Sequence, residues 1–162
     1  CDTNMMLILL MHDGKADTVV EQFDRLTSLL GLEEFRKVFP VILTDNGSEF
    51  KHTKEMETTD DGKKRTKIFY CDPQASWQKP KIEKNHEFIR YVLPKGKSLN
   101  PYTQEDMTLL ANNINSTRRN LLGGKSPYEV ITNKSVLNLM KLMGLHMIPS
   151  DEVNLTPKLL KR

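Results

Sequence analysis

Residues 41–50 constrain the fold of this 162-residue chain more than any other stretch. Their apolar beginning, 41–43, is typical of a buried strand, which Asp45-Asn46-Gly47 then ends abruptly. An Asn-Gly pair after a strand favours backbone conformations with positive φ, so we expect the chain to turn there. The Asp45 carboxylate is then left at the carboxyl end of a strand, where open α/β sheets bind their ligands. Asp45 is therefore a candidate site residue, the alternative being an Asp that only caps the turn.

The rest of the chain alternates the patterns of strands and helices. The continuous apolar run 4–11 predicts a strand covered on both faces, and the spacing of apolar residues over 16–30 predicts an amphipathic helix capped by Gly31. Residues 50–67 are polar and predict an exposed loop or hairpin. We also predict a short helical turn at 32–39, a strand at 68–71, and helices at 82–92, after Thr103, from Ser126 and at 136–143. Residues 149–162 predict a tail that packs on a partner or stays mobile. This order favours an α/β domain.

Composition excludes several classes of protein. No run approaches the roughly 18 apolar residues of a membrane span. Two cysteines, one of them terminal, give neither a disulfide framework nor a CxxC pair, which favours a reducing cytoplasm. The four histidines lack zinc-finger spacing, and a net charge of +3 does not by itself indicate nucleic acid binding.

Four segments in a fixed order carry a resemblance to a known family. They are 43–50, the Ser76-Trp77-Gln78 triplet, a helix with Glu83, Asn85 and Arg90 that runs into 93–96, and 115–129. Together they resemble the DDE transposases and retroviral-type integrases, most closely the insertion-sequence-thirty group of bacterial transposases. The resemblance implies a ribonuclease-H-like mixed sheet flanked by helices, N-terminally truncated, with an integrase-type core over 1–132 and a C-terminal helix and tail over 133–162.

The same resemblance implies a catalytic pair. Asp45 and Glu83 match the family's catalytic, metal-binding carboxylates, with Mg²⁺ or Mn²⁺ as the cofactor. Glu87 is a competitor for Glu83, but the family pattern places Asn two positions after the catalytic Glu, which Asn85 satisfies. Hard divalent ions held by carboxylates suit this chemistry, because phosphodiester cleavage and strand transfer are in-line displacements that two such ions stabilise. Supporting roles fall to Asn46, Gly47, Trp77 and Asn85.

Basic residues surround Glu83 and predict contacts with DNA phosphates. The alternative is an ordinary solvated helix face. Trp77 either stacks on an unpaired base or anchors its loop to the core. In the segment that 115–129 matches, the family often has Pro where this chain has Thr117. This difference weakens the transfer of a DNA-binding role to Arg118 and Arg119. The predicted nucleic-acid-binding residues are Lys79, Lys81, Lys84, Arg90, Lys95, Lys97, Arg118, Arg119 and Lys125.

The function that the resemblance implies is DNA cleavage and joining during transposition. The partners are transposon ends and target DNA, and no membrane is involved. The protein is expected to be a homo-oligomer in the bacterial cytoplasm, associated with the nucleoid. The alternatives are a catalytically inactive DNA-binding fragment of a transposase and a ribonuclease-H-like nuclease. In the family the first catalytic Asp precedes the strand that 4–11 matches. We therefore expect this chain by itself to be catalytically inactive, since Asp2 and Asp13 do not occupy that position.

Overall fold

The computed structural model describes residues 3–71 and 80–160, and for 80–83 it describes the backbone alone. The chain divides into two compact units, each described here by itself. One, the helical unit, joins Cys1–Leu10 to Lys79–Arg162, and the other, the sheet unit, is Met11–Gln78. The chain is therefore an α/β protein, rich in helix with a small parallel sheet. Within the described residues, every helix falls short of the length and apolarity that a bilayer span needs.

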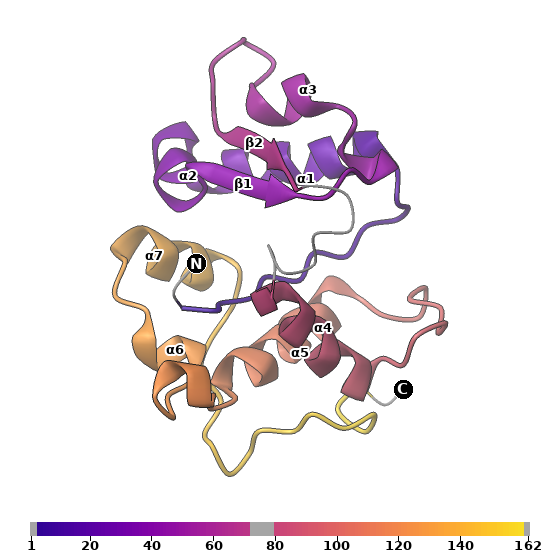
Figure 1. Cartoon of the computed structure of the whole chain (residues 1–162), viewed down its shortest axis with the longest axis vertical. Helices are drawn as coiled ribbons and strands as arrows, with labels where there is room; N and C mark the ends of the chain where they lie inside the picture. Colours follow the sequence, from indigo (N-terminus) through magenta and orange to yellow (C-terminus); the bar gives the residue numbers. More distant parts are fainter. Residues whose placement is uncertain (1–2, 72–79, 161–162) are drawn as a thin grey trace. The chain divides into compact units, whose positions relative to one another are not determined.

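The sheet unit packs two parallel strands against a long helix (Figure 1). Val41 of β1 lies opposite Lys67 of β2, and the core behind the strands is formed by Val19, Met56 and Ile68. Its elements are α1 (Ala16–Leu30), α2 (Leu32–Val38), β1 (Val41–Thr44), the 3₁₀ turn η1 (Ser48–Phe50), α3 (Thr53–Glu57) and β2 (Lys67–Tyr70). The predicted helices at 16–30 and 32–39 and the strand at 68–71 are confirmed.

A glycine sets the boundary between α1 and α2. Gly31 has φ 77°, and its N–H donates to the carbonyl of Thr27 over 2.8 Å. A side chain would be strained at this positive φ, so glycine can end α1 in a conformation that is unfavourable for other residues. The predicted cap at Gly31 is confirmed.

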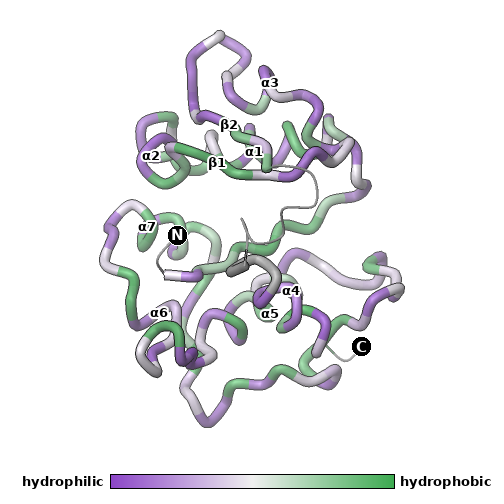
Figure 2. Tube along the Cα trace, in the orientation of Figure 1, coloured by the Kyte–Doolittle hydropathy of each residue, from purple (hydrophilic) through white to green (hydrophobic). Residues whose placement is uncertain are grey.

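The predicted burial of β1 is wrong for one of its faces. Val41 and Leu43 are 55% and 45% exposed, and Phe69, which lies opposite Leu43, is 52% exposed. Alternate residues of a strand point to opposite faces, and α1 covers only the face that carries Ile42 and Ile68. Figure 2 shows the apolar colour running along β1.

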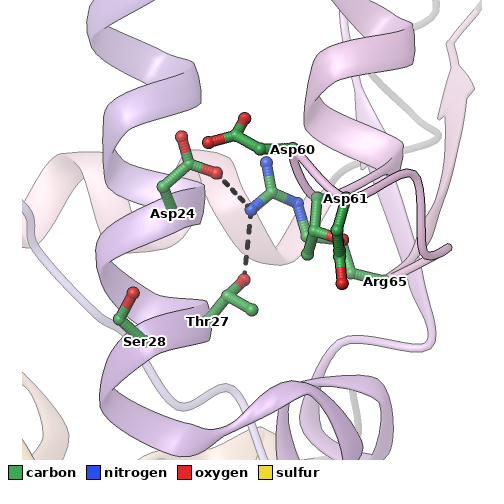
Figure 3. Close-up of a pocket in the computed structure, with 7 residues that line it drawn as sticks. Asp24, Thr27, Ser28, Asp60, Asp61 and Arg65 are labelled. Atoms are coloured by element: carbon green, nitrogen blue, oxygen red, sulfur yellow. Dashed lines mark hydrogen bonds and ion pairs between the residues drawn. The ribbon is translucent and has the colours of Figure 1, made fainter.

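Arg65 is the structural centre of the polar stretch 50–67. An antiparallel bridge between Thr58 and Lys64 forms the predicted hairpin, but Arg65 is only 1% exposed. Its Nη1 donates to Asp24 Oδ1 over 2.6 Å, and its Nε donates to the Met56 carbonyl over 2.9 Å. Figure 3 shows this guanidinium facing α1 beside a pocket at the hairpin. The stretch is thus anchored to α1 at its end, and it also contains the helix α3, which the sequence did not predict.

The helical unit is built around α5. The side chains of Leu110, Ala111 and Ile114 are fully buried and that of Met107 is 2% exposed, as its apolar stripe predicts. Thr103 and Asp106 form the predicted capping box, each side chain accepting a hydrogen bond from the other residue's backbone N–H. The elements are α4 (Pro80–Val92), α5 (Gln104–Ser116), the 3₁₀ turn η3 (Asn120–Leu122), α6 (Pro127–Val130) and α7 (Lys134–Leu142).

The N-terminal segment 4–11 is not a strand, so that prediction is wrong. Side-chain amides of α5 take the place of a neighbouring strand. Asn115 accepts from the Met6 N–H over 2.9 Å and donates to the Met6 carbonyl over 2.8 Å. Gln104 accepts from the Leu10 N–H and donates to the Ile8 carbonyl, both over 2.9 Å. We call these four bonds the amide clip.

The tail packs within its own unit, unlike the prediction of a partner-bound or mobile segment. Polar side chains on α5 accept its backbone N–H groups: Ser116 from Ile148 and Asn113 from Asn154, both over 2.8 Å. Leu160 is 6% exposed and joins the core cluster of α4 and α5. The C-terminal half of α5 therefore binds the tail through its buried polar side chains.

Candidate nucleic-acid interface

Asp45 follows the last residue of β1 and is exposed. Its Oδ1 accepts a long hydrogen bond, 3.4 Å, from the N–H of Gly47. Gly47 has φ −61°, so the predicted turn with positive φ is wrong. An added Cβ at Gly47 would meet the Glu49 carboxyl group, which is the end of a flexible side chain and can move aside. The site therefore begins with a carboxylate on an Asx-type turn at the end of a parallel strand.

Helix α4 carries the second predicted carboxylate, Glu83, whose backbone lies in its first turn and whose side chain lies outside the described residues. Two positions later Asn85 is 8% exposed, and its Oδ1 accepts from Arg119 Nη1 over 2.8 Å. Asp45 belongs to the sheet unit and Glu83 to the helical unit. Their pairing therefore stays a prediction.

Arg119 is buried against α4 and α5. Only 8% of it is exposed, its Nη2 donates to the Ile114 carbonyl over 3.2 Å, and its guanidinium lies 5.1 Å from the Phe88 ring centre. Its Nε finds no hydrogen-bond acceptor in the described part of the chain. Burial lowers the pKa of the guanidinium because the charged form loses hydration. These contacts hold α4 and α5 together, and they turn Arg119 away from solvent.

The other predicted cations that the structure describes are exposed. Lys84 donates to Glu87 Oε2 over 2.5 Å, and this hydrogen bond raises the pKa of the Lys84 amine. Arg118 is 65% exposed and lies 3.8 Å from a Glu129 carboxylate oxygen. Arg90, Lys95, Lys97 and Lys125 are also exposed. The Lys81 side chain and the whole of Asp2, Trp77 and Lys79 lie outside the described residues.

The described residues do not by themselves form a metal site. Among them, no group of three or more His, Cys, Asp or Glu side chains lies close enough together to hold an ion. The Asp45 oxygens suit Mg²⁺ or Mn²⁺ chemically, but a lone carboxylate is not a binding site.

Sequence reasoning named Arg118, Arg119 and Lys125 in the loop that links α5 to α6, but it missed the apolar tip between them. Its tip, Leu121, is 83% exposed between two exposed cations, Arg118 and Lys125. The Gly123-Gly124 pair was the available signal, because adjacent glycines mark a tight turn.

Comparison with known proteins relates the chain to transposases. It is 34% identical over 65 residues to the transposase of insertion sequence element IS1086 from Cupriavidus metallidurans, which covers 40% of this chain and 19% of that protein. It is 38% identical over 65 residues to the transposase InsI of element IS30A from Escherichia coli, covering 40% and 17%. With the transposase of element IS4351 from Bacteroides fragilis it shares 29% identity over 107 residues, covering 66% and 31%.

These matches show that the chain is related in sequence to the transposases of insertion sequence elements. Within that class the relatives include the insertion-sequence-thirty group, so the resemblance read from the motifs is confirmed. The matches span between 17% and 31% of the length of these three relatives. No family model matches the chain, and no solved structure does.

Proposed function

We propose that this chain is the catalytic-core portion of a ribonuclease-H-like transposase that cleaves and joins DNA phosphodiesters. Its relationship to insertion-sequence transposases carries the proposal. Two features of the structure support it: a carboxylate at the carboxyl end of a parallel strand and a helix that exposes Lys84 and Arg90. The resemblance assigns Asp45 and Glu83 to catalysis.

We propose Mg²⁺ or Mn²⁺ as the cofactor, with Asp45 and Glu83 among its ligands. Such ions stabilise the attacking and leaving oxygens of an in-line phosphoryl displacement. The test is Mn²⁺ binding followed by electron paramagnetic resonance, with Asp45→Asn and Glu83→Gln each expected to lose affinity. Asp151→Asn, which replaces an exposed aspartate, is the matched control. If both site variants bind Mn²⁺ as the unaltered chain does, the assignment of the ligands is wrong.

DNA binding tests the proposal more broadly. We expect the chain to bind duplex DNA, and Lys84→Ala or Arg90→Ala to weaken binding across sequences and flatten the salt slope by about one unit. Lys141→Ala, an exposed lysine in the last turn of α7, is the control and should leave the slope unchanged. Fluorescence anisotropy at several salt concentrations gives both quantities. Equal salt slopes for the unaltered chain and the three variants would show that DNA contacts a surface other than α4.

A nicking assay asks whether this chain by itself cleaves DNA. We expect this chain alone to leave supercoiled plasmid uncut in Mg²⁺ or Mn²⁺. Nicking that Asp45→Asn abolishes would show instead that the chain holds a complete site.

A further inference from the structure

We propose that the loop 118–125 is a DNA-contacting element in which Leu121 enters the minor groove and the two flanking cations contact phosphates. The inference rests on the proposed function, because it takes duplex DNA as the partner. It adds an apolar contact at the tip, and it assigns the neighbouring Arg119 to holding the loop.

The loop is held by its own backbone. Arg119 and Lys125 form an antiparallel bridge, with the Arg119 N–H donating to the Lys125 carbonyl over 3.0 Å. The Arg119 carbonyl accepts from the N–H groups of Leu122 and Gly124 over 3.0 and 3.1 Å. Gly123 and Gly124 have φ of 64° and 79°, conformations that L side chains rarely adopt. A loop with this many internal bonds presents its tip in one defined conformation.

Arg119 fixes the base of the loop to the helices. Its side chain is bonded to Asn85 of α4 and to the Ile114 carbonyl of α5, and it stacks over Phe88. On the far side of the loop, Ser126 is 1% exposed and caps α6 through a capping box with Glu129. Both ends of the loop are therefore anchored in the helical unit.

The tip itself is apolar and open to solvent. Leu121 is 83% exposed, whereas the next most exposed large apolar side chain among the described residues, Met147, reaches 56%. A single exposed leucine on a surface is ordinary. Minor-groove proteins insert apolar side chains, leucine among them, between base steps. A leucine held at the tip of an anchored turn between two cations suits that contact.

The charges around the tip fit a polyanion. Arg118 and Lys125 are exposed on either side of Leu121. The nearby carboxylate of Glu129 accepts from the Ser126 N–H over 2.7 Å, which lowers the pKa of that carboxylate and engages it within the helix cap. Its approach to Arg118, 3.8 Å, is a weak surface contact. Both cations are thus able to meet phosphates while Leu121 meets the groove.

The test measures binding of the whole chain to a short duplex with 2-aminopurine at central steps. We expect Leu121→Ala to weaken binding about tenfold, the loss of one buried leucine contact. The salt slope should not change, and the fluorescence rise from unstacked 2-aminopurine should disappear. Leu121→Met should retain both. Leu137→Ala, which removes a 43% exposed leucine from α7, is the matched control.

The second part of the test concerns the two cations that flank Leu121. Arg118→Ala and Lys125→Ala should each reduce the salt slope by about one unit. If the chain binds DNA but Leu121→Ala matches it in affinity and in 2-aminopurine signal, the loop inference is overturned and the proposed function stands. If the chain binds no duplex at any salt concentration, the proposed function itself fails.

Discussion

Arg65 and Arg119 are the buried arginines of the described residues, and they are stabilised differently. Arg65 forms an ion pair with Asp24 and donates to two backbone carbonyls, so its charge is neutralised. Arg119 bonds to an amide and a carbonyl, and in the described part of the chain no carboxylate forms an ion pair with it. A buried charge without a counter-charge costs stability, so we infer that the role of Arg119 is to position the groups to which it bonds.

Arg65 should be essential to the stability of the sheet unit. Its replacement by Ala leaves the carbonyls of Met56 and Glu55 without donors, and we expect a loss of about 3 kcal/mol in the free energy of unfolding. Urea denaturation measures this loss. Lys63→Ala, in the same hairpin but exposed, should leave the midpoint unchanged. An Arg65→Ala midpoint equal to that of the unaltered chain would contradict the anchoring role.

Arg119 should behave as an anchor in DNA binding and not as a phosphate contact. We expect Arg119→Lys to weaken binding while leaving the salt slope as it is, since the lost contacts are internal. Anisotropy titrations across salt concentrations distinguish the two roles. A slope reduced by about one unit would instead identify Arg119 as a direct phosphate contact.

Asp13 should make stability depend on pH in the acid range. A hydrogen bond from the Thr18 hydroxyl, followed by one from the Lys15 N–H, lowers the pKa of Asp13 to about 2. A lowered pKa stabilises the fold above the unfolded-state pKa, about 3.9, and this contribution is lost as the pH falls toward 2. Asp13→Asn should therefore reduce the change in urea midpoint between pH 5 and pH 2. An unchanged difference would contradict this assignment.

At the scale of elements, the longer helices were predictable, whereas the short helix α3 and the partners of strands were not. The spacing of α1, the Thr103 cap of α5 and Pro127 at the start of α6 are local signals, and all three are confirmed. Segment 4–11 has the composition of a buried strand, yet a strand needs a neighbour that its own sequence does not specify. The φ of Gly47 was also mispredicted, because Gly47 keeps an extended backbone where it leads into the 3₁₀ turn η1. The Asp45–Glu83 pairing depends on the resemblance and stays a prediction.

The amide clip gives an element-scale prediction. Asn115→Ala should expose the Met6 amide to hydrogen exchange, since its acceptor is removed. Asn113→Ala is a crossed control: it should expose the Asn154 amide of the tail and leave Met6 protected. Protection lost at both amides in both variants would show that α5 itself unravels, which would contradict independent binding of the two segments.

At the scale of the whole molecule, one of the two units is built from two separate stretches of the chain. The helical unit joins the first residues of the chain to its second half, so Met6 bonds to a residue 109 positions away. The sheet unit is one continuous stretch with its own core. Contacts distant in sequence form slowly because they first require a large loop to close. We infer that the sheet unit forms before the amide clip during folding.

Separate cores should respond separately to cavities. Leu110→Ala in the helical unit and Met56→Ala in the sheet unit each remove a fully buried side chain, and each should cost about 2–5 kcal/mol. We expect hydrogen exchange to rise first in α5 for the former and in α1 for the latter. Equal rises in both helices for either variant would show one cooperative unit.

The amide clip binds peptide groups, which every residue except proline supplies in full. Substitutions within 5–10 that keep the segment apolar should therefore be tolerated, whereas exchange of Asn115 or Gln104 should not. Among homologous chains we expect this segment to drift in sequence while those two amides persist. A proline at position 6 or 10 would be the exception, because it removes the N–H that the clip binds.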